Sequence, residues 1–267
     1  MILVKDLKIR TQFVPLIVIV LCTSAAFAQK YEVNKNAHSH NDYMQSAPFF
    51  NAYNNRFASI EIDVFLVGKQ LYVAHSKKEI DTTKTIEKLY LEPLLAEIEK
   101  NGGKPYKGGG GLQFMIDLKI AGVPALKVLE AKLKPIRKYF DTKNNPNAVR
   151  LVLSGSLPTP EQFKDFDKIF FFDGKSGVNY TADQLERIAF FSTSLAQFSK
   201  WDGKGRMLAA EQEKALKFVD SVHHVGKPVR FWGNPDTKAC WKLFVKMGVD
   251  YLNTDSPAKM AKFLKRR

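Results

Sequence analysis

The chain has 267 residues, of which 45% are hydrophobic and 25% are charged. This hydrophobic content is too high for a disordered chain, and 16 glycines and 12 prolines are too few for a fibrous one. The formal net charge of +14 fits either a well solvated surface or an attraction to phosphate-bearing or membrane-surface substrates. Basic residues do not alternate with aromatic ones along any segment, so nucleic-acid binding is not expected.

The first 28 residues are typical of a secretory signal peptide. Basic residues precede the apolar run Phe13–Leu21, and Ala26-Phe27-Ala28 matches a small-x-small cleavage site. An uncleaved anchor is the alternative, but this run is too short to span a bilayer. We therefore expect a secreted or periplasmic protein whose residues 29–267 form one domain. Cys240 would be its single cysteine, which excludes a disulfide within the chain.

Short β-rich runs alternate with helical patterns through residues 29–267. The expected strands are 36–39, 59–66 with 71–74, 112–117, 149–154, 168–172, 188–192, 228–232 and 250–253. The expected helices are 43–56, 84–100, 122–140, 160–166, 181–186, 208–225, 235–247 and 256–265. About eight βα units predict a (β/α)8 TIM barrel of the α/β class. An open doubly wound sheet is the alternative, but no Gly-x-Gly-x-x-Gly sequence follows the first strand.

Carboxylates occur on neighbouring strands, near the ends where barrel enzymes place their active sites. Glu61 and Asp63 are two residues apart on one strand, so both side chains point to the same face. Asp117 repeats this pattern on the next strand. Inward carboxylates are costly unless they are paired or bind a cation, and oxygen ligation suits Mg²⁺ or Ca²⁺ rather than Zn²⁺. An ion pair with Lys119, or carboxylates that face water, is the alternative.

Two histidines close strands near these carboxylates: His38 ends the first strand and His75 follows the run 71–74. Because imidazole transfers protons near neutral pH, the pair predicts a general base and a general acid on two sides of a phosphorus centre. A cation, helped by Lys119, would neutralise the non-bridging oxygens. The histidines could instead join the carboxylates as Zn²⁺ or Mn²⁺ ligands in a hydrolase of another substrate class.

These motifs carry a family resemblance. The run His38…Glu61-Ile62-Asp63…His75, with Asp117-Leu118-Lys119, Phe231-Trp232-Gly233-Asn234 and the closing Gly248–Pro257, resembles the glycerophosphodiester phosphodiesterases. That group belongs to the wider barrel superfamily of phosphatidylinositol-specific phospholipase C-like phosphodiesterases. The segment His-Ser-His-Asn-Asp-Tyr, residues 38–43, resembles more narrowly the altered-inheritance-of-mitochondria branch and its secreted bacterial relatives. The likeness spans residues 37–257.

The resemblance implies a (β/α)8 barrel that cleaves a phosphodiester with Mg²⁺ or Ca²⁺ as cofactor, in many relatives through a cyclic phosphate. By this resemblance the metal ligands are Glu61, Asp63 and Asp117, the general acid and base are His38 and His75, the phosphate contact is Lys119, and Trp232 lines the pocket.

The first strand departs from the family pattern. Glycerophosphodiesterases usually carry His-Arg-Gly where this chain has His38-Ser39-His40, which makes His40 an alternative to His38 as the catalytic histidine. With His38 preferred, the loop residues His40, Asn41 and Asp42 would bind substrate in place of the missing arginine. The third acidic position is Asp117 rather than the more usual Glu, as in the sphingomyelinase D type of barrel.

We therefore expect a monomeric, metal-dependent phosphoric diester hydrolase. Its substrate would be a phospholipid headgroup ester or a glycerophosphodiester-like molecule, met in solution or at a membrane surface. The alternatives are a catalytically weak barrel that binds phosphorylated ligands, and a phosphomonoesterase. Ser154 and Asp173 also follow strands. We prefer to interpret both as turn residues, and the alternative is that they face the pocket and contact substrate.

Overall fold

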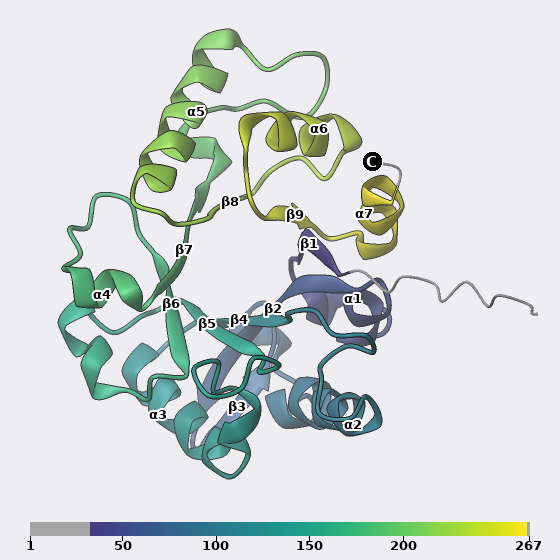
Figure 1. Ribbon diagram of the computed structural model, residues 1–267, viewed down its shortest axis with the longest axis vertical. Coiled ribbons are helices and arrows are strands. Elements are labelled where there is room, and N and C mark those ends of the chain that lie inside the picture. The colour runs from purple at the N-terminus through teal and green to yellow at the C-terminus, as the bar shows by residue number, and fades with distance from the viewer. Residues whose placement is uncertain (1–32, 266–267) are drawn as a thin grey trace, which may run out of the picture. The chain divides into compact units, whose positions relative to one another are not determined.

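The computed structural model describes residues 33–265, so the predicted signal peptide, residues 1–28, lies outside the described part of the chain. The described residues form a nearly closed barrel of eight parallel strands with helices around it (Figure 1). This confirms the predicted (β/α)8 barrel over the open doubly wound sheet.

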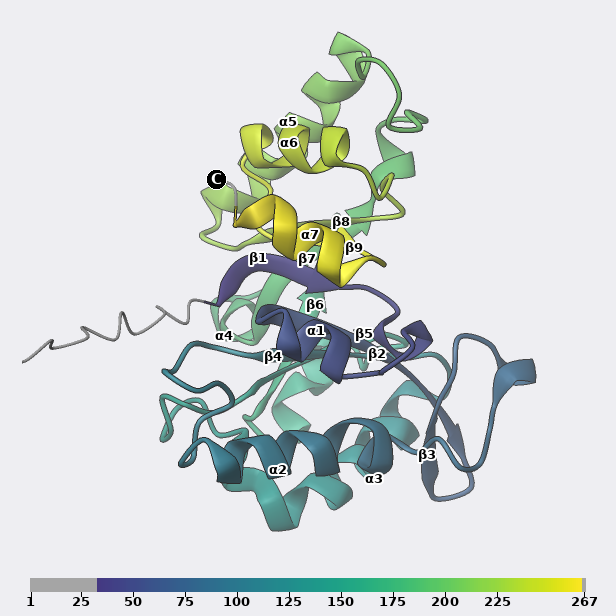
Figure 2. The ribbon, with the colours of Figure 1, turned by 90° about the vertical axis from the view of Figure 1, so that its right-hand side faces the viewer.

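The barrel strands are neighbours in the order β8-β7-β6-β5-β4-β2-β1-β9. Their bounds are β1 (Asn34–Ser39), β2 (Phe57–Val67), β4 (Gln113–Leu118), β5 (Arg150–Gly155), β6 (Phe170–Gly174), β7 (Ile188–Ser194), β8 (Val229–Trp232) and β9 (Leu252–Thr254). An isolated bridge joins Arg230 of β8 to Tyr251, the residue before β9. Strand β3 (Gln70–Val73) pairs antiparallel with the end of β2, and this hairpin lies at one end of the barrel (Figure 2).

Helices lie outside the strands, at the positions that the sequence predicts. They are α1 (Phe50–Asn54), α2 (Glu92–Lys100), α3 (Gly122–Leu133), α4 (Ala182–Glu186), α5 (Ala209–His224), α6 (Lys238–Met247) and α7 (Pro257–Leu264). Shorter turns of helix are η1 (Asp42–Met44), η2 (Lys77–Glu79), η3 (Glu87–Leu91), η4 (Lys134–Tyr139), η5 (Pro160–Asp165) and η6 (Leu195–Gln197). Helix α6 shows why the bounds of a helix can be predicted from its capping residues. At its start the Thr237 side chain accepts a hydrogen bond from Cys240 N–H, and Gly248, with φ +80°, ends it.

Three predicted helices are divided in the structure. The expected helix 122–140 consists of α3 and the 3-10 turns of η4, within which Ile136 has non-helical φ and ψ. The expected helix 43–56 consists of η1 and α1, because the intervening segment contains Pro48 and because Phe49 has φ +64°, which no α-helix accommodates. The expected helix 84–100 begins as the π-helical turn η3 before it continues as α2.

The strands bury hydrophobic side chains on both faces. Ile60, Ile62 and Val64 of β2 are fully buried in the layer between the barrel and its helices. A second cluster, formed by Met115, Val152, Ala189 and Phe190 with Phe171 and Tyr251 against it, comes from the inward positions of the strands. On β4 the next inward residue after Met115 is Asp117, which pairs with Asp63 of β2. The cluster therefore lies directly beneath the polar site.

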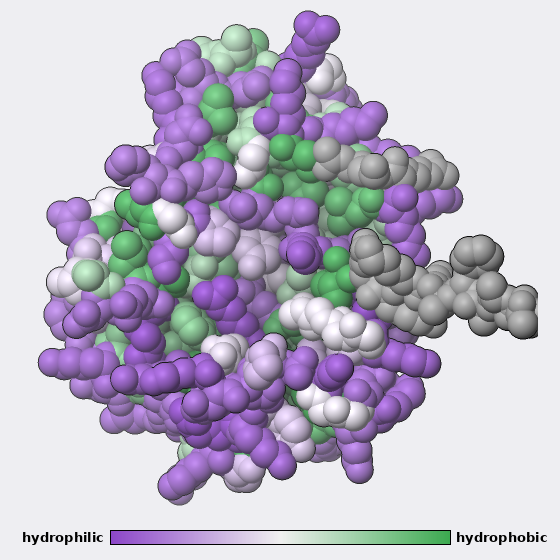
Figure 3. Space-filling model, in the orientation of Figure 1, coloured by the Kyte–Doolittle hydropathy of each residue, from purple (hydrophilic) through white to green (hydrophobic). Residues whose placement is uncertain are grey.

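The surface agrees with the composition. Hydrophilic residues dominate the face shown in Figure 3, and hydrophobic residues form small separate groups on it. Within residues 33–265, none of the helices combines the length and the apolar character needed to cross a lipid bilayer.

Candidate active site

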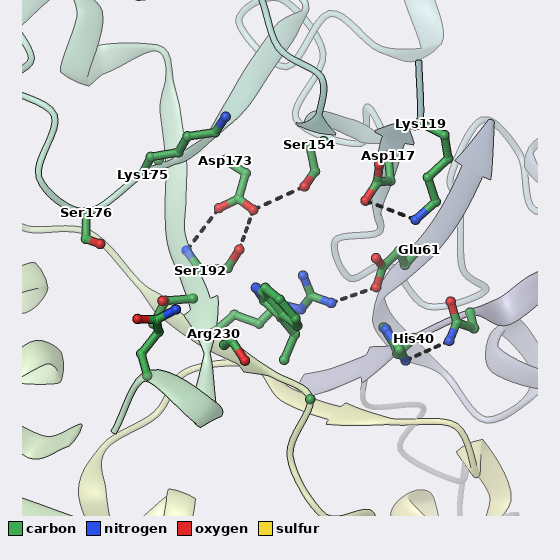
Figure 4. Close-up of a pocket in the computed structure, with 18 of the residues that line it drawn as sticks. His40, Glu61, Asp117, Lys119, Ser154, Asp173, Lys175, Ser176, Ser192 and Arg230 are labelled. Carbon is green, nitrogen blue, oxygen red and sulfur yellow. Dashed lines mark hydrogen bonds and ion pairs between the residues drawn. The ribbon is translucent and has the colours of Figure 1, made fainter. Parts of the chain in front are cut away.

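A cavity of about 620 Å³ opens where the barrel strands end (Figure 4). Its lining comes from the carboxyl ends of β2 and β4 to β8 and from the loops that follow β1 and β3. This is the face on which barrel enzymes carry their active sites. The volume is that of a pocket for a small molecule or a lipid headgroup.

Three carboxylates cluster here as the strand pattern predicts: Glu61 and Asp117 line the cavity, and Asp63 is fully buried beside them. Glu61, Asp63 and Asp117 each place an oxygen within 4.8 Å of the others. The parallel pairing of β2 with β4 sets Asp63 directly opposite Asp117. The alternative interpretation, an ion pair with Lys119, also holds: its Nζ lies 2.8 Å from Asp63 Oδ2 and 3.5 Å from Asp117 Oδ2.

The residues of this cluster fit a divalent cation. Asp63 Oδ1 is buried and has no hydrogen-bond partner among the described residues. A buried carboxylate oxygen without a partner is costly, and a cation held among three carboxylates would satisfy it. The oxygen-only donor set suits Mg²⁺ or Ca²⁺.

Burial weakens the acidity of two members of the cluster. It raises the pKa of Asp117 to about 6, although the charge of Lys119 opposes the shift. Burial also raises the pKa of Asp63, against the hydrogen bonds from Lys119 and Tyr43. Cation binding favours the ionised carboxylates and would therefore displace protons from this cluster.

Glu61 differs because a buried arginine faces it. Arg230 Nη2 donates to Glu61 Oε2 at 2.7 Å, and only 2% of Arg230 is exposed. Burial alone would raise the pKa of Glu61, but the Arg230 charge and the hydrogen bond with His38 outweigh it and hold this pKa well below its usual range. The sequence analysis did not identify Arg230; a charged residue inside the apolar run 229–232 was the available signal.

His38 lies beneath the site rather than in it. Its side chain is fully buried, between Ser59 Oγ at 2.8 Å from Nδ1 and Glu61 Oε2 at 3.0 Å from Nε2. Burial, with the Arg230 charge, lowers the pKa of His38 to about 3, so the ring is neutral near pH 7. Gln113 donates to Ser59, so the consistent arrangement has Ser59 donate to Nδ1 and Nε2–H donate to Glu61. His38 therefore orients a carboxylate and does not line the cavity.

Two other histidines line the cavity: His40 and His75. His75 is half exposed, and its Nδ1 lies 3.0 Å from Tyr43 Oη and 3.5 Å from Asp63 Oδ2. His40 Nδ1 lies 2.7 Å from Asp255 Oδ1, near the start of α7. The structure thus brings His40, the alternative of the sequence analysis, to the cavity in the place expected for His38.

Of the other residues predicted to contact substrate, Asn41, Lys119 and Trp232 line the cavity. Asp42 does not line the cavity, so the prediction that it binds substrate is wrong. It is fully buried and accepts hydrogen bonds from three donors: Ser39 Oγ, Phe49 N–H and Tyr90 Oη. The chain turns back at η1 immediately after His40 and Asn41. The hydrogen bonds to the Asp42 carboxylate hold this loop against the barrel.

The next part of the cavity wall contains Ser154 and Asp173, which the sequence analysis interpreted as turn residues, and Ser192, which it did not single out. Asp173 accepts from Ser192 N–H at 3.0 Å, from Ser192 Oγ, and from Ser154 Oγ at 3.3 Å. All three residues line the cavity. Burial raises the pKa of Asp173 to about 6, against the hydrogen bonds from Ser192. The signal in the sequence was a polar residue directly after each of three apolar runs, on consecutive strands.

Family models match both ends of this fold. The AIM6-like phosphodiesterase domain matches residues 28–173, and the glycerophosphoryl diester phosphodiesterase family matches residues 228–258. The first match contains the carboxylate cluster and its histidines, and the second contains Arg230 and Trp232.

Individual proteins give the same grouping. The altered inheritance of mitochondria protein 6 homolog of Arthroderma benhamiae is 29% identical, over 82% of this chain and 80% of the relative. The corresponding protein of Eremothecium gossypii is 26% identical, over 90% of this chain and 72% of the relative. Two solved structures share the fold at 14% identity: a glycerophosphodiester phosphodiesterase from Parabacteroides distasonis and an Oleispira antarctica phosphodiesterase in complex with its product sn-glycerol-3-phosphate. Their TM-scores are 0.54 and 0.55, with coverage of 89% and 86% of this chain and 99% and 96% of theirs.

Proposed function

The chain belongs to the AIM6-like phosphodiesterase domain family, and from this premise we propose that it hydrolyses phosphoric diesters with a bound divalent cation. The observation that carries the proposal is the cluster of Glu61, Asp63 and Asp117, of which Glu61 and Asp117 line the same cavity as two histidines. Carboxylates that converge within 4.8 Å, with imidazoles beside them, match what phosphodiester cleavage needs.

The three carboxylates would hold the cation, Mg²⁺ or Ca²⁺. When bound, it would neutralise charge on the non-bridging phosphate oxygens. Lys119 Nζ reaches the same place from β4 and would add a second positive charge at the phosphoryl group. His38 and Arg230 both hydrogen-bond to the Glu61 carboxylate from below the site. Glu61, as a metal ligand, would therefore keep one orientation while substrate enters.

Proton transfer falls to the two histidines that reach the cavity. One imidazole takes the proton of the attacking hydroxyl, and the other gives a proton to the leaving oxygen. With Asp255 at His40 Nδ1, the Nε2 atom of His40 is available to substrate. Tyr43 Oη holds the Nδ1 side of His75 in the same way, at 3.0 Å.

The proposed substrate is a phospholipid headgroup ester or a glycerophosphodiester-like molecule. A cavity of about 620 Å³ accommodates a headgroup and its phosphate, and apart from glycines and Trp232 the side chains that line it are polar or charged. The signal-peptide pattern of residues 1–28 supports a secreted or periplasmic location, where such headgroups would be met in solution or at a membrane surface.

The decisive experiment measures hydrolysis of bis(p-nitrophenyl) phosphate by the metal-free protein and after addition of Mg²⁺ or Ca²⁺. We expect metal-dependent turnover, and a loss of about 100-fold or more in kcat for His75→Ala. His223→Ala is the matched control, because His223 pairs with Asp250 outside the cavity. No turnover with any metal, or full activity of His75→Ala, would contradict the proposal. Faster hydrolysis of p-nitrophenyl phosphate would favour the phosphomonoesterase alternative.

A further inference from the structure

The cavity has a second wall that the proposed reaction does not use. Ser154 and Asp173 are the second-to-last residues of β5 and β6, and Ser192 lies near the end of β7. In Figure 4 Ser192 and Asp173 lie away from His40, Glu61 and Lys119, and Ser154 lies between Asp173 and Asp117, with which it pairs across β4 and β5. We propose that it is a subsite for the alcohol portion of the substrate, and that this alcohol is a neutral, polyhydroxylated group such as an inositol or a sugar. The inference rests on the proposed function, because it names the substrate class of the same cavity.

The hydrogen bonds of the wall fix what it can recognise. Both the Ser154 and the Ser192 hydroxyls donate their protons to Asp173 Oδ2. A hydroxyl that has donated its proton offers only lone pairs to a ligand. The two serine oxygens therefore face the cavity as acceptors at fixed positions, and a ligand must bring donors to meet them. Substrate hydroxyls are such donors.

Asp173 keeps this arrangement rigid. Its carboxylate is buried and accepts on both oxygens: Oδ1 from Ser192 N–H and Oδ2 from the two serine hydroxyls. Both of its oxygens therefore have hydrogen-bond partners before any ligand binds. This separates Asp173 from a free carboxylate that would attract an ammonium group, and makes it the residue that positions the serines.

A lysine beside the serines disfavours a cationic alcohol at this wall. Lys175 lines the same side of the cavity and makes no ion pair with another described residue. Choline carries no N–H or O–H donor once it is esterified, and its recognition depends on aromatic faces around the quaternary nitrogen. Histidines apart, Trp232 is the one aromatic side chain that lines the described cavity. One indole cannot enclose a quaternary ammonium, but it can pack against one face of a cyclic polyol.

The test compares two diesters that share glycerol phosphate: glycerophosphoinositol and glycerophosphocholine. We expect the full chain to prefer the inositol diester by about tenfold or more in kcat/KM, since unmatched polar groups penalise the other. Ser192→Ala should reduce this preference by about tenfold, mainly through KM, with Ser154→Ala as a second variant. The matched control is Ser221→Ala, whose hydroxyl donates to Phe218 O on α5 and lies outside the cavity.

The outcomes separate this inference from the proposed function. Equal kcat/KM for the two diesters, or equal losses for both in the serine variants, would overturn the subsite while leaving phosphodiester hydrolysis in place. If no diester is hydrolysed, the proposed function fails, and calorimetric binding of the two diesters decides the subsite by itself. Selective binding of the inositol diester would support it, whereas equal binding or none would overturn it.

Discussion

The two walls of the cavity use buried aspartates in opposite ways. On the carboxylate side, which comprises Glu61, Asp63 and Asp117, Asp63 Oδ1 has no partner among the described residues. On the hydroxyl side, which comprises Ser154, Asp173 and Ser192, both oxygens of Asp173 accept hydrogen bonds. Burial raises the pKa of Asp63 and of Asp173 alike, so solvation does not distinguish them. The two aspartates differ in their hydrogen bonds. The unpartnered oxygen of Asp63 can bind a cation, whereas both oxygens of Asp173 already have donors.

This contrast assigns different tasks to the two sides. An incomplete, like-charged cluster lowers its free energy by taking up a divalent ion, and such an ion acts on phosphate. A saturated network of hydroxyls gains nothing from an ion but holds its acceptors still, which suits selection among alcohols. Arg230 lies between the sides and donates to Glu61, so it belongs to the carboxylate side.

The largest difference should appear when each aspartate loses its charge. Asp63→Asn removes a cation ligand, and we expect kcat/KM for bis(p-nitrophenyl) phosphate to fall by about 1,000-fold or more, with weaker Mg²⁺ binding by calorimetry. Asp173→Asn keeps the size of the side chain and should cost about tenfold or less. Similar losses in kcat/KM and in Mg²⁺ affinity for the two variants would show that the sides do not divide the work.

The strands and the carboxylate side could be predicted from the sequence because periodicity determines both. Alternation within Ile60–Val64 sends Glu61 and Asp63 inward, and parallel pairing then brings Asp117 beside them without any knowledge of loops. The divided helix 43–56 was less accessible, since Phe49 adopts φ +64° for tertiary reasons that no local pattern reveals.

The rest of the site depends on loops and on long-range pairing. His38 and His40 are two residues apart, and only the turn at η1 decides which one reaches the cavity. Asp42 reads as a loop carboxylate, but its donors include Tyr90, 48 residues away. Arg230 meets Glu61 across 169 residues, so its role follows from barrel closure rather than from its neighbours in the chain.

A glycine on the hydroxyl side should sharpen the comparison, because it touches the carboxylate side. Gly155 ends β5 with φ +76°, and a Cβ there would lie 2.1 Å from Asp117 Oδ1 and 2.7 Å from Leu118 O. Gly155→Ala should displace Asp117, weaken Mg²⁺ binding by about tenfold and lower the free energy of unfolding by roughly 2–3 kcal/mol.

The control for this substitution is Gly177→Ala in the loop after β6. Gly177 has φ +78°, but a Cβ would meet nothing within 4 Å. It should therefore show only the backbone strain of about 1 kcal/mol in chemical denaturation, with unchanged Mg²⁺ affinity. If both variants bind Mg²⁺ equally, contact across the two sides does not control the position of Asp117.

The smallest effect concerns the support beneath the carboxylate side and depends on pH. Burial lowers the pKa of His38 to about 3, so the unfolded chain binds this proton more readily than the folded chain between about pH 6.5 and pH 3. The stability that the neutral His38 contributes is therefore present above pH 6.5 and is lost as the pH falls through this window.

His38→Gln keeps a donor for Glu61 and removes the titration. The free energy of unfolding of the metal-free wild type, minus that of the variant, should rise by on the order of 1 kcal/mol per pH unit from about pH 4 to pH 6, and then level off. Urea titrations at several pH values measure this difference, and the shifts of Asp117 and Asp173 cancel because both proteins contain them. A difference that does not change with pH would mean that His38 accepts its proton in the folded state. In that case His38 would be a cation paired with the Glu61 carboxylate. It would then remain an alternative to His40 as the catalytic histidine.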